Sequence, residues 1–457
     1  MGWANPVRRI IILGAAGRDF HNFLTFYKNN PDYRVVAFTA TQIPGIEKRT
    51  FPAKLAGKSY PEGIPIFSEQ KLPSLIEELR ADEVVLSYSD VTNLDVMHKA
   101  SISLASGASF GLLGPNDTML VSKKPVIAVC AVRTGAGKSP TTRKISLALR
   151  DMGYRVGIIR HPMPYGDLVE EAVQKFSTFG DLDTQRVTIE EREEYESHIA
   201  NGFTVYAGVD YARILKLAEK SSDIIIFDGG NNDFSFVRPD LLFVVADARR
   251  PGHELTYHPG ETNVRMADYI IVNKIDAASK EDREKVIENV KQLNPRAKIL
   301  LSNLRITVED PEAIKGARVL CVEDGPTLTH GGLSTGAAFR IATEKGAREI
   351  VDPRKYAVGS IKEVFGKFPH LGNVLPAMGY SERQRRELEE TIDGTDCDLV
   401  IIGTPVDLRG DLKLRKRTLR VTYELEEIGD LTISKILEVE RKNLFGKNRS
   451  RSLKTIH

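Results

Sequence analysis

The sequence contains few cysteines, no long apolar run and almost no net charge. The three cysteines, Cys130, Cys321 and Cys397, are far apart and form no metal-binding pattern. Neither a stretch of about 18 apolar residues nor a signal peptide is present, so we expect a soluble, cytoplasmic protein. A formal net charge of +2 argues against a general nucleic-acid or membrane binder.

Length and composition predict a globular protein of several domains. With 457 residues, of which 41% are hydrophobic, the chain is too long for one ordinary domain and can bury a real core. The alternation of strand and helix patterns predicts an α/β fold in three parts. We expect a Rossmann-like parallel sheet at residues 1–122, a P-loop NTPase core with a parallel sheet at 123–305, and an α/β domain with a glycine-rich loop at 306–457.

Residues 124–150 have the layout of a phosphate-binding P-loop. An apolar, β-rich run at 125–131 predicts a buried strand, and a helical pattern follows the loop up to Arg150. The nucleotide-binding candidates in the loop are Gly135, Ala136, Gly137, Lys138 and Ser139. Glycines let backbone N–H groups turn toward an anion. Lys138 can reach the β- and γ-phosphates, and the Ser139 hydroxyl can ligate Mg²⁺.

The loop departs from the common Walker A pattern at one position. The first glycine of G-x-x-x-x-G-K-S would fall at Val132 and is missing. Arg133 stands beside it, five residues before Lys138, which marks the deviant Walker A group. Such loops carry a second cation that is often used across a dimer. We therefore predict a catalytic role for Arg133, beside Lys138, and a homodimer.

A Walker B pattern follows at residues 223–233. Four apolar residues end in Asp228 and two glycines. We predict that Asp228 is catalytic and faces Mg²⁺ or one of its waters, so that Ser139 and Asp228 form the metal site. Asp233, near the same strand end, is either a general base or a helix cap without a chemical role.

Cationic residues follow the ends of two further predicted strands. They are Arg160 and His161 after residues 154–159, and Arg249, Arg250 and His253 after residues 241–246. Ligands of open α/β sheets bind at the carboxyl ends of strands, and arginine suits a polyanion. We predict that these residues bind an acidic, phosphorylated substrate; simple exposure to solvent is the alternative.

The predicted strand at 269–272 leads into the N-K-x-D motif by which GTP-binding P-loop proteins read their base. Here it consists of Asn273, Lys274 and Asp276 around Ile275. The carboxylate of Asp276 could accept hydrogen bonds from guanine N1–H and the exocyclic amine. The three residues are therefore nucleotide-binding candidates, and a chance polar strand end is the alternative.

The N-terminal part has the pattern of a Rossmann-like sheet without its cofactor signature. Strands are expected at residues 8–14, 33–40, 83–88 and 110–113. The turn from Gly14 to Gly17 lacks the full dinucleotide fingerprint, and no acidic residue closes the second strand. We therefore expect no NAD, and either a supporting sheet or an anion site at this turn.

The C-terminal part is marked by one glycine-rich segment. Residues 318–322 are predicted to form a strand that opens into residues 323–332, a polar loop of the kind that closes on a ligand. A helix is expected at 381–391 and an edge strand at 419–423. Earlier in the chain, the acidic stretch 179–197 is expected to be a solvated, partly helical face.

Four segments together carry a resemblance to a known family. They are V-R-T-G-A-G-K-S at 132–139, R-H-P-M-P-Y-G at 160–166, D-G-G-N-N-D at 228–233 and V-E-D-G-P-T-L-T-H-G-G at 322–332. Nearly the whole chain resembles the cyclic 2,3-diphosphoglycerate synthetase family, whose members are similar to deviant Walker A NTPases. The last segment is the most specific mark.

The resemblance implies an ATP-dependent ligase that closes 2,3-bisphosphoglycerate into a cyclic pyrophosphate and releases ADP and phosphate. Mg²⁺ and ATP would be the cofactors, with GTP as the alternative that the N-K-x-D motif suggests. Two other classes stay open. One is a GTPase that acts as a regulatory switch, and the other is a metallochaperone-like NTPase, which would need exposed Cys or His clusters that the sequence does not show.

Overall fold

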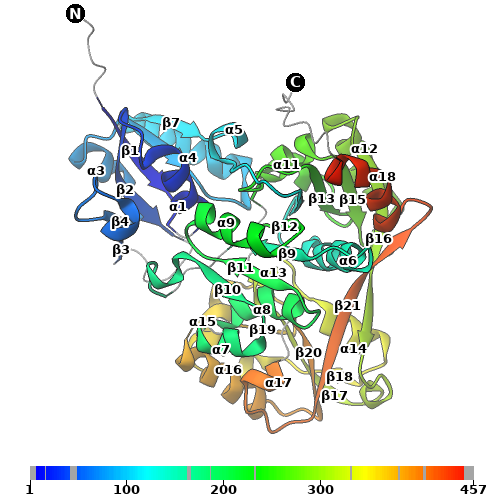
Figure 1. Cartoon of the computed structure of the whole chain (residues 1–457). Coiled ribbons are helices and arrows are strands. Elements are labelled where there is room, and N and C mark those ends of the chain that lie inside the picture. Colours follow the sequence, from blue (N-terminus) through cyan, green and yellow to red (C-terminus); the bar gives the residue numbers. More distant parts are fainter. Residues whose placement is uncertain are drawn as a thin grey trace, which may run out of the picture.

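The computed structural model describes residues 7–15, 17–41, 49–161, 166–185, 187–230, 233–329, 332–378, 381–404 and 408–446. Residues 16, 162–165, 231–232 and 330–331, which belong to motifs discussed above, lie outside this part. The molecule contains two large sheets with helices packed around them (Figure 1). The predicted α/β class is confirmed.

The N-terminal part is a six-stranded sheet with the order β3-β4-β2-β1-β5-β7, parallel except where β3 pairs with β4. Its strands are β1 (Arg8–Leu13), β2 (Tyr33–Ala40), β3 (Thr50–Phe51), β4 (Ile64–Ser68), β5 (Glu83–Leu86) and β7 (Ser109–Leu112). Its helices are α1 (Arg18–Asn22), which continues as the π-helix Phe23–Tyr27, α2 (Ala53–Ala56), α3 (Leu72–Glu78), α4 (Asn93–Ala105) and α5 (Pro115–Thr118). From Ile10 to Leu13 the central strand β1 is apolar and buried on both faces, as expected for a parallel sheet covered by helices.

The second sheet has thirteen strands in the order β10-β11-β9-β12-β8-β13-β15-β16-β21-β20-β17-β18, with β19 beside β17. The P-loop half comprises β8 (Val126–Ala131), β9 (Val156–Arg160), β10 (Gln174–Phe176), β11 (Thr204–Ala207), β12 (Ile224–Asp228), β13 (Leu241–Asp247), β15 (Tyr269–Asn273) and β16 (Lys298–Val308). The C-terminal half comprises β17 (Arg318–Asp324), β18 (Glu349–Ile350), β19 (Leu375–Ala377), β20 (Leu399–Gly403) and β21 (Thr418–Ile428).

Strand β21 corrects one prediction. Residues 419–423 were expected at a sheet edge, but β21 lies inside the sheet, antiparallel to β16 and parallel to β20. The two long strands β16 and β21 join the P-loop half to the C-terminal half in Figure 1. Because β16 crosses residue 305, one sheet runs through both halves, and the proposed domain boundaries stay a prediction.

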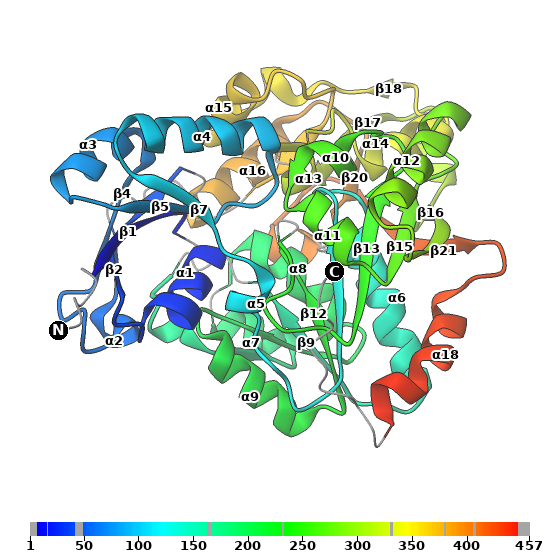
Figure 2. The same ribbon diagram turned by 90° about the horizontal axis from the view of Figure 1, so that it is seen from above.

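Helices cover both faces of the P-loop half. On one face lie α6 (Lys138–Asp151) and α18 (Ile433–Phe445), whose apolar side chains share a core with Ile226 and Val245 of the sheet. On the other face lie α9 (Tyr211–Ser221), α11 (Gly260–Met266) and α12 (Lys280–Leu293). Figure 2 shows α18 and α6 on the side of the molecule away from the N-terminal sheet. Shorter helices nearby are α7 (Phe179–Thr184), α8 (Ile189–Ile199) and α10 (His253–Thr256).

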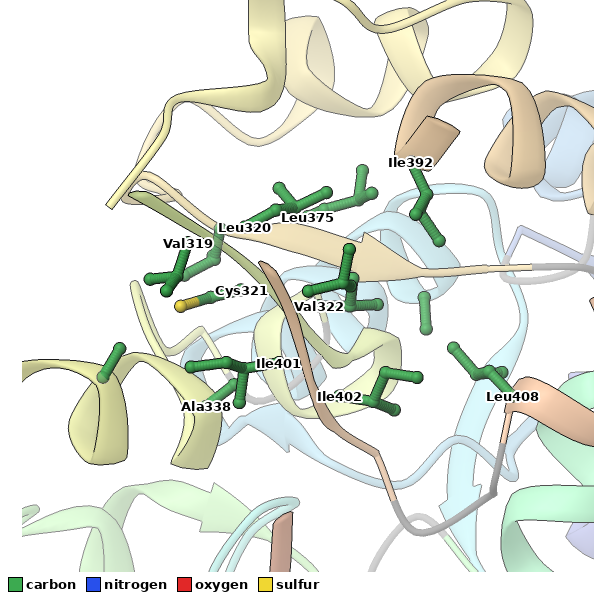
Figure 3. Packing of buried hydrophobic residues seen from close by; sticks show 14 of the residues in the cluster. Val319, Leu320, Cys321, Val322, Ala338, Leu375, Ile392, Ile401, Ile402 and Leu408 are labelled. Carbon is green, nitrogen blue, oxygen red and sulfur yellow. The ribbon is translucent and has the colours of Figure 1, made fainter. Parts of the chain in front are cut away.

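The C-terminal half has its own apolar core. Val319, Leu320, Cys321 and Val322 of β17 pack with the side chains of β20 and with the helices on either face (Figure 3). These helices are α14 (Ala337–Glu344), α15 (Gly359–Lys367), α16 (Glu382–Gly394) and α17 (Leu408–Asp411). Part of the predicted glycine-rich loop is helical, because Gly325–Thr329 forms α13.

The carboxyl ends of the two sheets are joined by two ion pairs, one buried and one largely buried. Arg18, just after β1, donates to Asp233 at 2.7 Å. Asp90, after β5, accepts from Arg133 of the P-loop at 3.0 Å. Two short strands, β6 (Val91–Thr92) and β14 (Tyr257–His258), add an antiparallel pair across the same junction. The N-terminal part is therefore fixed directly against the P-loop.

Candidate functional site

The P-loop runs from the end of β8 into the first turn of α6. Gly135 and Gly137 have φ values of 79° and 115°, a region that other residues rarely adopt. A Cβ on Gly137 would lie 2.1 Å from the amide nitrogen of Asn273. The loop therefore needs glycine at position 137, both for its backbone angle and for the close approach of Asn273.

Lys138 and Asp228 contact each other at the base of the loop. The Nζ of Lys138 donates to Asp228 Oδ1 at 2.5 Å, and the carboxylate is fully buried. Burial alone would raise the pKa of Asp228, but Arg160 and Lys138 hold it well below its usual range. Burial, and then Arg160, lowers the pKa of Lys138 to about 8. The site thus holds an ionised carboxylate paired with the Lys138 ammonium group.

The two carboxylate oxygens of Asp228 have three more donors. Thr142 donates to Oδ1 at 3.0 Å, while Arg160 and His198 contact Oδ2 at 2.8 and 3.1 Å. A divalent cation placed directly on this carboxylate would meet three basic side chains, so the arrangement does not fit Asp228 as a direct metal ligand. The Ser139 hydroxyl, on the wall of the cavity described below, fits an ion bound with a nucleotide.

Asn273 and Lys274 donate hydrogen bonds to backbone carbonyls of the P-loop. The Asn273 side chain donates to the carbonyl of Ala136 at 2.8 Å. Lys274, at a φ of 63°, donates to the carbonyl of Gly135 and pairs with Asp247 at 3.0 Å. Burial lowers the pKa of Lys274 to about 8. Two members of the predicted base-reading motif therefore contact protein carbonyls that shape the loop.

The third member, Asp276, is bound to the C-terminal half. Its carboxylate pairs with Arg340 of α14 at 3.4 Å, and both side chains are about two-fifths exposed. Arg340 also pairs with Glu344 at 2.7 Å. Arg340, Glu344 and the neighbouring Ala277 line the cavity, whereas Asp276 is absent from its lining.

Arg133 faces the cavity and is held by residues of its own chain. Its Nε donates to Asp90, and its guanidinium lies 3.9 Å from the ring centre of Tyr257. The use of this arginine across a dimer, and the dimer itself, stay predictions.

The predicted substrate cations fall into three places. Arg160 lines the cavity but is 2% exposed and pairs with both Asp228 and Glu194. His161 lies toward the N-terminal part, where it contacts Asp233 at 3.4 Å. Arg249 lines the cavity and pairs with Asp247 at 2.8 Å.

Arg250 and His253 lie on the side of the loop that faces Asp90. Arg250 donates to the carbonyl of Thr134 at 3.1 Å, and its buried Nε and Nη2 have no hydrogen-bond partner in the described part of the chain. Burial, then Arg133 and Arg250, lower the pKa of His253 to about 4. The five residues predicted to bind one acidic substrate thus lie at different places around the P-loop.

A cavity of about 560 Å³ lies between the P-loop and the C-terminal half, a size in the range of small-molecule sites. The C-terminal wall contributes an apolar surface with three carboxylates, those of Glu323, Asp324 and Glu344. Glu323 is 1% exposed and accepts from the backbone N–H groups of Gly336, Ala338 and Phe339 at the start of α14. Burial raises its pKa to about 7 against these hydrogen bonds.

Some residues at the site escaped the sequence analysis. Glu194 belongs to the acidic stretch 179–197 that was expected to be a solvated face, yet it lines the cavity. His198, the residue directly after this stretch, is 1% exposed. Their spacing of four residues places them on one side of α8, which was the available signal. Arg340 belongs to α14, a helix that was not predicted from the sequence.

Two features are absent among the described residues. Among them, no group of three or more His, Cys, Asp or Glu side chains is placed to hold a metal ion. No helix in this part of the chain is long and apolar enough to cross a membrane.

Comparison with known proteins identifies the family. The model of the cyclic 2,3-diphosphoglycerate synthetase P-loop domain matches residues 200–302. Arginine synthetase ArcE of Thermococcus kodakarensis is 59% identical over 436 residues, which cover 95% of this chain and 97% of that protein. The chain belongs to the cyclic 2,3-diphosphoglycerate synthetase family. It is therefore an enzyme with a P-loop of the phosphoryl-transfer type, and it binds a nucleotide.

More distant members and structures share less with the chain. Cyclic 2,3-diphosphoglycerate synthetase of Thermococcus sibiricus is 29% identical over 160 residues, 35% of this chain and 32% of that protein. The structure of LpxK from Aquifex aeolicus in complex with ATP has a TM-score of 0.44 and 13% identity, covering 82% of this chain and all of LpxK. The MinD protein of Pyrococcus horikoshii with Mg-ADP covers 42% of this chain and 83% of MinD, at a TM-score of 0.25 and 14% identity.

Proposed function

We propose that the chain is a nucleoside-triphosphate-dependent arginine synthetase. The observation that carries this proposal is the 59% identity to arginine synthetase ArcE along 97% of that protein. The relatives named cyclic 2,3-diphosphoglycerate synthetase match about a third of the chain or less.

Chemistry suggests how a P-loop enzyme would make arginine. Phosphoryl transfer needs an oxygen acceptor, and the guanidinium carbon of arginine carries an oxygen in the corresponding ureido amino acid, citrulline. The ureido oxygen attacks the γ-phosphorus of ATP, and ADP leaves. Ammonia then adds to the activated carbon and expels inorganic phosphate. The sum is citrulline, ammonia and ATP giving arginine, ADP and phosphate.

The residues suit the nucleotide half of this reaction. We infer that the N–H groups from Gly135 to Ser139 cradle the phosphates and that Lys138 contacts the β- and γ-phosphates. Arg133 adds a second cation at the cavity wall. Mg²⁺ would bind through the Ser139 hydroxyl and would neutralise charge between the phosphates. Asp228 keeps Lys138 and Arg160 in place through its ion pairs.

The C-terminal wall suits a cationic amino acid better than a polyanion. Glu323, Asp324 and Glu344 line the cavity there. Glu323 already accepts from three backbone N–H groups and Glu344 pairs with Arg340, so Asp324 is the carboxylate with the most capacity for a ligand. An α-ammonium group and a developing guanidinium would find acceptors at this wall. The phosphates of a bisphosphoglycerate would meet carboxylates instead, at a cost in free energy.

The second candidate is the cyclisation of 2,3-bisphosphoglycerate, favoured by the family model and by the cations around the loop. Phosphoryl transfer from ATP onto one phosphate would form an anhydride, and the neighbouring phosphate would close the ring and expel inorganic phosphate. Arg160, His161, Arg249, Arg250 and His253 would serve its acid groups. ATP is the proposed nucleotide for both reactions.

One assay compares both proposals. The purified chain is mixed with ATP, Mg²⁺, citrulline and ammonium, and arginine and phosphate are measured by amino-acid analysis and phosphate release. We expect one arginine per phosphate. A parallel sample with 2,3-bisphosphoglycerate is followed by phosphorus NMR for coupled pyrophosphate signals. Cyclisation without arginine formation would reverse the order of the two candidates, and phosphate release without either product would contradict both.

A further inference from the structure

Asp90 of the N-terminal part pairs with Arg133, which lines the cavity beside the P-loop. Asp90 has a φ of 58°, a left-handed conformation that aspartate tolerates better than most residues. It immediately precedes β6, which pairs with β14, and the Asn93 side chain donates to the carbonyl of Leu255 at 2.9 Å. The residues that directly follow Asp90 are therefore bound to the P-loop half, which fixes the position of Asp90.

The carboxylate of Asp90 is committed to Arg133. Its Oδ1 accepts from Arg133 Nε at 3.0 Å, and the side chain is 7% exposed. Its Oδ2 is buried and has no hydrogen-bond partner in the described part of the chain. Burying a carboxylate oxygen without a hydrogen-bond partner costs free energy of folding. We therefore expect a role of Asp90 beyond the stability of the fold.

The surroundings of Arg133 explain why it needs a fixed partner. Arg250 and His253 lie close enough that Arg133 acts on the pKa of both. The charge of Arg250 repels the Arg133 guanidinium, whereas Asp90 and the face of Tyr257 attract it. These two contacts leave Arg133 on the cavity wall at the start of the loop.

We infer that Asp90 is a positioning residue for phosphoryl transfer, which holds Arg133 of the same chain at the nucleotide cavity. The N-terminal part thereby completes the P-loop site within one chain, whatever the oligomeric state. The inference concerns the nucleotide half of the reaction and does not depend on which acceptor the enzyme uses. It gives the N-terminal sheet a function in addition to support.

The test measures nucleotide turnover by the full chain. We expect R133A to lower kcat by about 10³-fold, the lower end of the range for arginines that contact a transferred phosphoryl group. We expect D90A to lower kcat by about tenfold and the KM for ATP much less, because a misplaced cation costs most in the transition state. D90N keeps the size of the side chain, and its kcat should lie between those of D90A and the unsubstituted chain.

A double variant separates positioning from folding. If Asp90 acts only through Arg133, D90A/R133A has the same kcat as R133A. The matched control is R18Q, which breaks the other buried ion pair of the junction, Arg18–Asp233, outside the cavity. R18Q should lower the melting temperature and leave kcat within about twofold. Additive losses in the double variant, or an unchanged kcat in both D90A and D90N, would overturn the inference.

Mixing inactive variants tests whether the arginine acts within its own chain. K138A and R133A are unfolded together, refolded as a mixture and assayed for nucleotide turnover. No activity above the sum of the two proteins is expected. Restored activity would mean that one subunit supplies Lys138 and the other Arg133, which contradicts the inference. Because the readout is nucleotide turnover, failure to form arginine would refute the proposed function alone.

Discussion

At the scale of single residues, Glu323 gives the clearest link between burial and pH. Its pKa in the folded chain, about 7, lies above its ordinary value of 4.5, because burial outweighs three backbone N–H groups. The folded chain therefore holds a proton that the unfolded chain releases between these pH values. It follows that the contribution of Glu323 is fully present below pH 4.5 and is lost as the pH rises to about 7.

We predict that this loss amounts to about 3 kcal/mol in the free energy of unfolding. Guanidinium titrations at pH 4.5 and 7.5 measure the free energy of unfolding of the unsubstituted chain and of E323Q. The decrease between the two pH values should be smaller in E323Q by most of this amount. E344Q removes the same charge from an exposed position on the same wall and serves as the control. Equal pH dependence in E323Q and the unsubstituted chain would contradict the prediction.

Local patterns were informative for some site residues and silent for others. Lys138 and Asp228 could be predicted because a strand, a glycine loop and a helix, or a strand ending in aspartate, are local patterns. The contact of Asp228 with His198 depends on how α8 packs near α6 and β12, which no single segment encodes. The pairing of Arg133 with Asp90 joins positions 43 residues apart in two different sheets.

At the scale of elements, the P-loop depends on one glycine more than on the others. Gly137 combines a φ of 115° with a neighbour, the Asn273 amide, that leaves no room for a Cβ. Gly153, just after α6, has a φ of 90° but no heavy atom within 4 Å of an added Cβ. At both positions a residue with a Cβ would be strained in the backbone, but only at position 137 would the Cβ also collide with a neighbour, Asn273.

We therefore predict different results for G137A and G153A. G153A should lose about 1–2 kcal/mol of stability, the usual cost of a left-handed residue, and bind nucleotide normally. G137A should in addition push Asn273 off the loop and weaken ATP binding by at least about tenfold, since the N–H cradle is displaced. Calorimetry and thermal unfolding measure both. ATP binding that is equally strong in the two variants would contradict this account of the loop.

The strands were predicted well where they are fully buried and poorly where they cross between halves. Strand β8 is apolar along its whole length, so the sequence predicted both the strand and its burial inside the sheet. Strand β21 alternates buried and exposed residues, the usual mark of an edge or a half-covered strand. Its inner position follows from pairing with β16 over eight residue pairs, a long-range contact that a local pattern cannot specify.

At the scale of the whole molecule, the cavity is formed only where the two halves of the large sheet meet. The contact between Asp276 of the P-loop half and Arg340 of α14 bridges this junction. The N-K-x-D motif predicted a guanine-reading carboxylate at position 276. In the folded chain that carboxylate pairs with Arg340, and Arg340, together with Glu344, lies on the cavity wall in its place.

We predict that Arg340 sets the base preference. The unsubstituted chain should bind ATP more tightly than GTP, because a carboxylate paired with arginine is a poor acceptor for guanine N1–H and its amine. In R340A the Asp276 carboxylate is released, and the ratio of GTP to ATP affinity should rise by about tenfold, the worth of one good bidentate contact. K345A removes an exposed charge just beyond the same helix and should leave the ratio unchanged. Calorimetric titration of each protein with both nucleotides measures the ratio. A chain that already prefers GTP, or an R340A variant with the original ratio, would show that Asp276 and Arg340 do not choose the base.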